Sequence, residues 1–220
     1  MPDVLNEDDL VSAKEKAIWF EGAAGRIEAV FNGAIQTKTK PFLAILGHPH
    51  SLHGGAMNNK VVTTLARACR EAGIASLRFN FRGVGKSEGE FDKGVGESDD
   101  LLQIMSELSI LFPKHKIILA GFSFGAFVTY RAACQSHPAL LISVAPAVNH
   151  GDFCEFDVVP SPWHVLVANE DEIVASQEIL AWHKTIKPSP QLHVFESTSH
   201  FFHGKLMFLR DKVISLLETL

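Results

Sequence analysis

The pentapeptide Gly121-Phe122-Ser123-Phe124-Gly125 places a serine between two glycines. Apolar residues 117–120 precede it and another apolar stretch follows at once, which predicts a buried strand that turns tightly into a buried helix. In such a turn the serine hydroxyl is exposed above the sheet, and the glycines allow close approach of strand and helix. Ser123 is therefore a candidate nucleophile.

A nucleophilic serine needs a base that takes its proton and a carboxylate that orients the base. In open α/β sheets such groups lie at the carboxyl ends of later strands. Asp171 follows the predicted strand 163–168, and His200 follows the predicted strand 191–196. We therefore expect Ser123, Asp171 and His200 to form a catalytic triad, in a chain order known for such triads.

Neighbouring residues offer alternatives for two of these positions. Glu170 and Glu172 flank Asp171 and are rival acids, while Asp171 itself has the type of a turn or helix-capping residue. His203 is the rival base, although its position suits the start of the final helix better. We favour Asp171 and His200.

The triad chemistry also requires an oxyanion hole, in which two backbone N–H groups aim at one point. The N–H of Phe124, directly after the nucleophile at a helix N-terminus, is one expected donor. The second is expected after the predicted strand 42–46, where Pro49 has no N–H. His50 is the preferred second donor and Ser51 the alternative. Phe201 and Phe202, beside the base, are candidates for an apolar substrate pocket.

Two loops resemble sites for other chemistries. His48, His50 and His53 have spacings similar to those of a metal-binding signature, but Leu52 stands where that signature has an aspartate. Residues 80–87, NFRGVGKS, nearly match a phosphate-binding loop, but Asn80 replaces its first glycine and no helix follows. Ser87 also lies in a second GxSxG pattern without a strand–helix context. We expect no metal site and no cofactor.

The remaining sequence predicts the elements that position these residues. Two short apolar runs within 16–31 indicate an antiparallel hairpin, and strand-then-helix units follow from residue 41. Helices are expected over 57–72, from about 101 to 111, from the Ser123 turn to about 135, over 179–186 and over 206–220. Strands are expected over 42–46, 76–81, 116–120, 140–147, 163–168 and 191–196. This alternation predicts a mostly parallel sheet covered on both faces, with no lid or cap domain.

Length and composition limit the function classes. The 220 residues suit one α/β domain over 1–220, with 1–15 as a loosely held N-terminal arm. The net charge of −5 gives no reason to expect nucleic-acid or membrane partners. Three separated cysteines, and an acidic start without signal-peptide features, predict a cytoplasmic protein. It is expected to be a monomer or homodimer.

The chain resembles the α/β-hydrolase superfamily from about residue 17 to its end, and is most similar to small, lidless bacterial hydrolases of the dienelactone-hydrolase-like or esterase-like kind. Stretches 47–62, 77–97, 119–128, 168–174 and 198–206 carry the resemblance. It implies an α/β-hydrolase fold with a sheet of about eight strands, the triad Ser123, Asp171 and His200, and a structural RGxGxS turn at RGVGKS. Members commonly have Gly-Asp-x-Asp where this chain has Ala168-Asn169-Glu170-Asp171.

Together these features predict a serine hydrolase that cleaves small carboxylic esters or thioesters through an acyl-enzyme. A peptidase or aminoacyl-releasing hydrolase with the same triad is the alternative enzyme. A binding protein that keeps the fold without turnover is the alternative from another class.

Overall fold

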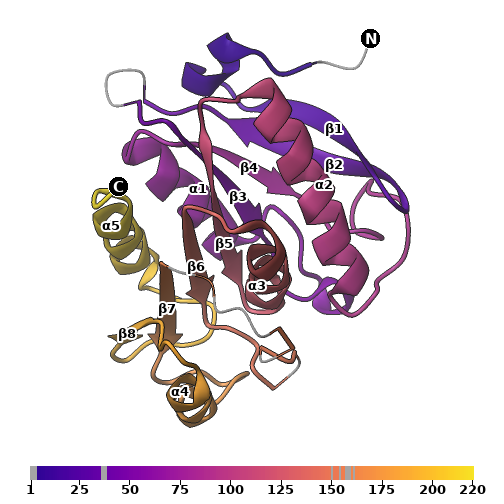
Figure 1. Cartoon of the computed structure of the whole chain (residues 1–220). Helices are drawn as coiled ribbons and strands as arrows, with labels where there is room; N and C mark the ends of the chain where they lie inside the picture. The colour runs from indigo at the N-terminus through magenta and orange to yellow at the C-terminus, as the bar shows by residue number, and fades with distance from the viewer. Residues whose placement is uncertain (1–3, 36–38, 150, 154, 157–159, 161) are drawn as a thin grey trace.

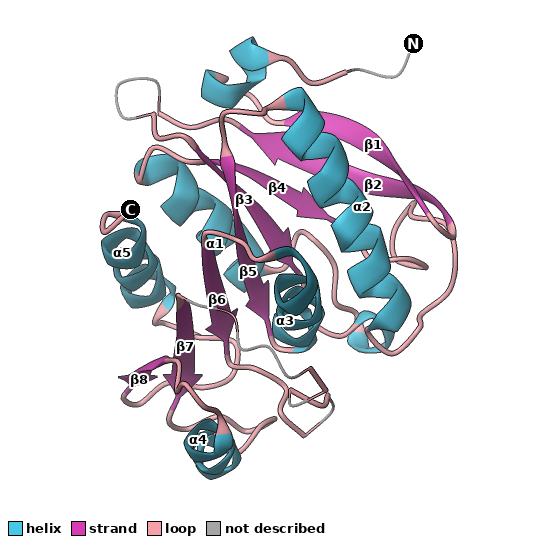
Figure 2. Ribbon diagram, in the orientation of Figure 1, coloured by secondary structure: helices cyan, strands magenta, loops and turns pink. Residues whose placement is uncertain are grey.

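The computed structural model describes residues 4–35, 39–149, 151–153, 155–156, 160 and 162–220. In this part of the chain an eight-stranded sheet lies between two layers of helices (Figures 1 and 2). The strands are Lys16–Gly22 (β1), Gly25–Asn32 (β2), Phe42–Gly47 (β3), Ala75–Phe79 (β4), Lys116–Phe122 (β5), Leu140–Val144 (β6), Trp163–Ala168 (β7) and Gln191–Phe195 (β8). The α-helices are Lys60–Glu71 (α1), Val95–Leu111 (α2), Phe124–Ser136 (α3), Ser176–Thr185 (α4) and Leu206–Leu217 (α5).

The strand order is β1-β2-β4-β3-β5-β6-β7-β8. Strand β2 pairs antiparallel with both β1 and β4, and every other neighbouring pair is parallel. This confirms the mostly parallel sheet with an antiparallel N-terminal hairpin. The carboxyl ends of β3 and β5 to β8 therefore meet at one edge, where loops from distant parts of the sequence come together.

Each face of the sheet has its own apolar core. Helices α1 and α5 contribute to the core on one face, and α2, α3 and α4 contribute to the core on the other (Figure 2). Strands β3 to β7 are almost continuously buried because helices cover them on both sides. None of the helices in the described residues is long and apolar enough to cross a membrane.

Local signals explain where most elements begin and end. The predicted helix over 57–72 starts at Lys60 because the Asn59 side chain accepts the N–H of Val61 at 2.8 Å. Gly73, with φ 82°, follows its end as expected. The strand predicted over 76–81 spans Ala75–Phe79, and the next residues turn into the glycine-rich loop.

The expectation of a loose N-terminal arm is wrong for the described part of residues 1–15. Glu7–Val11 forms a 3-10 helix (η1), which the Asn6 side chain caps. Leu5 and Leu10 are only 3% and 8% exposed and belong to the core shared by α2 and α3. Sequence polarity concealed this packing, because Leu5 and Leu10 are the only buried apolar residues within the described part of the arm.

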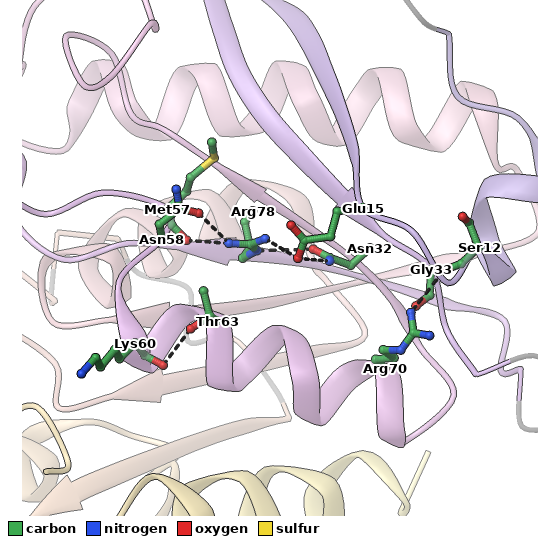
Figure 3. A network of polar contacts seen from close by, with 10 residues as sticks. All are labelled: Ser12, Glu15, Asn32, Gly33, Met57, Asn58, Lys60, Thr63, Arg70 and Arg78. Carbon is green, nitrogen blue, oxygen red and sulfur yellow. Dashed lines mark hydrogen bonds and ion pairs between the residues drawn. The ribbon is translucent and has the colours of Figure 1, made fainter.

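A buried arginine attaches the end of this arm to the sheet (Figure 3). Arg78 on β4 is 3% exposed, and its guanidinium donates hydrogen bonds to Glu15 at 2.8 Å and to the Asn58 side chain at 2.9 Å. Arg70 on α1 donates to the carbonyl oxygen of Ser12 at 3.2 Å. Residues 12–15 are thus held between β4 and α1.

A truncation of Leu10 tests whether the arm is part of the folded core. Leu10→Ala should lower the free energy of unfolding by about 2–3 kcal/mol, because it removes buried methyl groups and leaves a cavity. Urea denaturation monitored by circular dichroism measures this change. Val4→Ala is the control, since Val4 is 64% exposed and should change stability by less than about 0.5 kcal/mol. Equal stability of wild type and Leu10→Ala would contradict the packed arrangement.

Candidate active site

Ser123 lies at the junction of β5 and α3 in a backbone conformation that is rare for a residue with a side chain. Its φ is 55° and its ψ is −116°. Its N–H donates to the carbonyl oxygen of Val144 on β6 at 2.9 Å, which fixes the turn against the neighbouring strand. The side chain consequently lies at the carboxyl edge of the sheet, as expected for this turn, but the residue is buried and not exposed as the sequence predicted.

The flanking glycines are required by close backbone contacts. A Cβ atom on Gly121 would lie 2.1 Å from the carbonyl oxygen of Gly125. A Cβ atom on Gly125 would lie 2.5 Å from the carbonyl oxygen of Gly47 at the end of β3. Three backbone segments therefore meet here without space for a side chain.

The structure brings the three residues predicted as a triad into one hydrogen-bonded chain. Ser123 Oγ lies 3.1 Å from His200 Nε2, and His200 Nδ1 lies 2.7 Å from Asp171 Oδ2. An ionised carboxylate can only accept, so a neutral ring facing one would carry its proton on Nδ1 and leave Nε2 to accept from the serine hydroxyl. Ser123 and His200 are only 6% and 2% exposed.

The loop after β7 fixes the carboxylate of Asp171. Its Oδ1 accepts the N–H groups of Ile173 at 2.9 Å and Val174 at 2.8 Å, so the turn role considered for this residue is also present. Its Oδ2 is left for the imidazole. The side chain is fully buried, which keeps the carboxylate in a single orientation.

The rival acids have different contacts. The Glu172 carboxylate accepts the main-chain N–H of His200 at 3.0 Å rather than a proton of the ring. Glu170 is exposed, and its main-chain N–H donates to the carbonyl oxygen of Thr198. The rival base His203 is exposed in the turn before α5, which begins at Leu206. Its ring packs 5.9 Å from that of Phe201.

The two phenylalanines after His200 have opposite environments. The ring of Phe201 is 36% exposed and packs edge-on against His200, with ring centres 5.0 Å apart. Phe202 is completely buried in the core beneath α1 and α5, against Phe195. The expectation that Phe202 lines the substrate pocket is wrong, because φ 55° at this residue turns its side chain into the core.

The side of the site formed by β3 and α3 contains the residues predicted for the oxyanion hole. Phe124 is the first residue of α3, where helix geometry leaves the N–H without an intrahelical acceptor. The ring of His50 lies 4.9 Å from that of Phe124 and 5.0 Å from that of Phe91. Ser51 begins a short 3-10 helix, Ser51–His53 (η3), directly after His50. Both candidate donors for the second position are therefore in the loop after β3.

Comparisons with known proteins agree with this arrangement. The model of a hydrolase family described as serine aminopeptidase, S33 matches residues 50–159. An uncharacterized protein of Rickettsia prowazekii is 35% identical over 168 residues, which cover 74% of this chain and 69% of that protein. The chain belongs to the α/β serine hydrolases.

Solved structures of other members have the same fold. A serine hydrolase without a lid from Xanthomonas campestris is 42% identical and superposes with a TM-score of 0.88, over 93% of this chain and 94% of that chain. An α/β serine hydrolase homologue from Coxiella burnetii is 38% identical, with a TM-score of 0.89 over 98% and 99% of the two chains.

In this α/β hydrolase, His48 is a structural residue. It is fully buried, its Nε2 accepts the N–H of Phe81 at 3.0 Å, and its Nδ1 lies 2.7 Å from the carbonyl oxygen of Pro49. Both ring nitrogens are thus used by the main chain, so neither is available to a metal. The rings of His50 and His53 stack with centres 4.5 Å apart. Sequence reasoning missed this role, because the packing of β4 against the loop after β3 is not visible locally.

The second GxSxG pattern is also structural. The Ser87 hydroxyl donates to the carbonyl oxygen of Asn80 at 2.8 Å and accepts the N–H of Glu28 at 2.9 Å. The Asn80 side chain accepts the N–H of Met57 at 2.9 Å. These bonds hold the glycine-rich loop against β2, and Ser87 is only 7% exposed.

The buried imidazole of His48 predicts a pH dependence of stability. Burial lowers its pKa from 6.5 to about 4, whereas the unfolded chain has the ordinary value. Between these values the unfolded state binds more protons, so the free energy of unfolding falls as the pH falls from 6.5 towards 4. When the pH falls from 6.5 to about 4.5, the protonation of this group in the unfolded state should lower the free energy of unfolding by about 2 kcal/mol.

His48→Gln isolates this contribution, because a glutamine oxygen still accepts the N–H of Phe81 but does not titrate. Urea unfolding at the two pH values should show a smaller loss of stability in the variant, by the amount given above. Other histidines contribute equally to both proteins and cancel. Parallel pH dependences of the two proteins would show that His48 is not held neutral.

Proposed function

We propose that this α/β hydrolase cleaves small carboxylic esters or thioesters through an acyl-enzyme on Ser123. The hydrogen-bonded chain from Asp171 through His200 to Ser123 is the observation that carries this proposal. A neutral imidazole with its proton on Nδ1 presents an unprotonated Nε2 to a serine hydroxyl, which is the tautomer needed by a general base.

In the acylation step, His200 Nε2 takes the proton of Ser123 as Oγ attacks the acyl carbon. Asp171 stabilises the imidazolium that forms and keeps the ring in its orientation. The imidazolium then gives this proton to the leaving alcohol or thiol as the ester bond breaks. A water molecule, deprotonated by the same nitrogen, attacks the acyl-enzyme and regenerates Ser123. No cofactor enters this scheme.

The negative oxygen of each tetrahedral intermediate requires fixed donors. The Phe124 N–H at the start of α3 is the first, and the positive end of the helix dipole adds to its effect. The main-chain N–H of His50 is the proposed second donor, with that of Ser51 as the alternative. Both follow β3, whose end contacts the α3 turn at Gly125.

Exposed apolar residues in three loops at the carboxyl edge of the sheet support a substrate with apolar groups. Leu52, Ile173 and Phe201 are 68%, 51% and 36% exposed, and they follow β3, β7 and β8 respectively. Apolar side chains exposed on loops that leave the same edge of the sheet favour contact with alkyl or aryl groups of a ligand. Small uncharged esters have such groups, and we propose them as the substrate class.

A peptidase or aminoacyl-releasing hydrolase is the second candidate. The description of the matching family as serine aminopeptidases favours it. The same residues would act, but His200 would protonate an amine leaving group. Parallel assays of p-nitrophenyl esters and aminoacyl p-nitroanilides, with matched acyl groups, separate the two candidates. A higher kcat/KM on the anilides would favour the peptidase.

The nucleophile is tested with a fluorophosphonate probe and short p-nitrophenyl esters. Ser123→Ala should abolish labelling and lower kcat by about 10⁴-fold or more, because no other hydroxyl replaces the attacking atom. Ser87→Ala is the matched control from the other GxSxG pattern and should label normally per folded molecule. Undiminished labelling of Ser123→Ala would refute the proposed nucleophile. A folded wild type inert to the probe, the esters and the anilides would instead favour the alternative of a binding protein without turnover.

A further inference from the structure

We propose that Glu172 is a positioning residue for His200, a role that rests on the proposed hydrolase function. Its carboxylate holds the main chain of the base, while the adjacent Asp171 holds the ring. Neither glutamate beside Asp171 is needed for the triad itself, and only Glu172 contacts His200.

The contact satisfies a buried donor. His200 is 2% exposed, and its N–H donates to Glu172 Oε2 at 3.0 Å. A buried N–H without an acceptor is costly, and a charged acceptor makes a shorter and stronger bond than a neutral one. Glu172 is itself exposed, so its contribution is this hydrogen bond rather than packing in the core.

The segment that carries His200 needs such support because it lies at the margin of the sheet. Strand β8 is the last strand, has five residues and is only partly buried, with Val194 45% exposed. The backbone on either side of His200 has positive φ values, 48° at Ser197 and 55° at Phe202. Such conformations persist only where surrounding contacts hold them.

Apart from the bond between Asp171 and the His200 ring, the other hydrogen bonds that the described residues make between the loops after β7 and β8 involve residues before His200. The N–H of Asn169 donates to the carbonyl oxygen of Phe195 at 3.1 Å, and that of Glu170 donates to the carbonyl oxygen of Thr198 at 3.0 Å. The Asn169 side chain accepts the N–H of Thr198 at 3.3 Å. Of the hydrogen bonds described between these two loops, the one that Glu172 accepts is the one made by the main chain of His200 itself.

Two attachment points define the direction of the imidazole better than one. The bond from Nδ1 to Asp171 at 2.7 Å fixes the ring only relative to the loop after β7. The bond to Glu172 fixes the main chain of the same histidine to that loop. Nε2 is then held towards Ser123, which directly follows β5, and β5 lies three positions from β8 in the sheet.

A pair of near-isosteric substitutions separates the hydrogen bond from other roles. Glu172→Met keeps the side-chain length but offers no carboxylate acceptor. It should lower kcat, and the rate of fluorophosphonate labelling, by about 10- to 100-fold with little change in KM, because a displaced base slows the chemical step. Glu172→Gln keeps an acceptor oxygen and should restore both rates to within about threefold of wild type. Glu170→Met is the control and should match wild type.

Amide hydrogen exchange at His200, followed by NMR, tests the contact without turnover. The amide should be protected in wild type and in Glu172→Gln, and should exchange at least about tenfold faster in Glu172→Met. Equal protection in all three proteins, unchanged rates in Glu172→Met, or equal losses in the Met and Gln variants would overturn the proposed role. Failure of Ser123→Ala to lose labelling would instead refute the proposed function, and the exchange result would still decide whether Glu172 holds the loop.

Discussion

The close contact between β5 and α3 is the constraint on which the site depends. Ser123 has φ 55° only because the turn around it is fixed by backbone groups that would collide with any side chain at Gly121 or Gly125. Gly47 brings the end of β3 to the same place. One steric requirement therefore sets the direction of the serine, the position of the first turn of α3 and the start of the loop that contains His50.

The remaining two groups come from the opposite margin of the sheet and are held differently. Asp171 and His200 follow β7 and β8, which lie two and three positions from β5. No close packing of glycines fixes them. Instead, polar contacts join their loops, including the two main-chain N–H groups that hold Asp171 and the carboxylate of Glu172 that holds His200. Steric exclusion positions Ser123, whereas hydrogen bonds position Asp171 and His200.

This difference explains how much of the molecule the sequence could predict. Strand ends, helix stops such as Gly73 and the turn at Ser123 depend on a few consecutive residues, so local patterns indicate them. The bond from Glu172 to His200 joins residues 28 positions apart, and no pattern distinguished it from a rival acid. Phe202 and the packed arm at Leu10 depend on which core a side chain enters, which only the assembled sheet determines.

The serines and histidines of this protein also differ in the hydrogen-bond partners of their side chains. His48 and Ser87 bond only to main-chain groups, so their hydrogen bonds hold loops together and leave no proton to transfer. His200 has a carboxylate on one ring nitrogen and a serine hydroxyl on the other. A proton on that hydroxyl can move to the ring without breaking a main-chain contact. Hydrogen-bond partners thus distinguish Ser123 from Ser87 and His200 from His48. Residue type alone would not distinguish them.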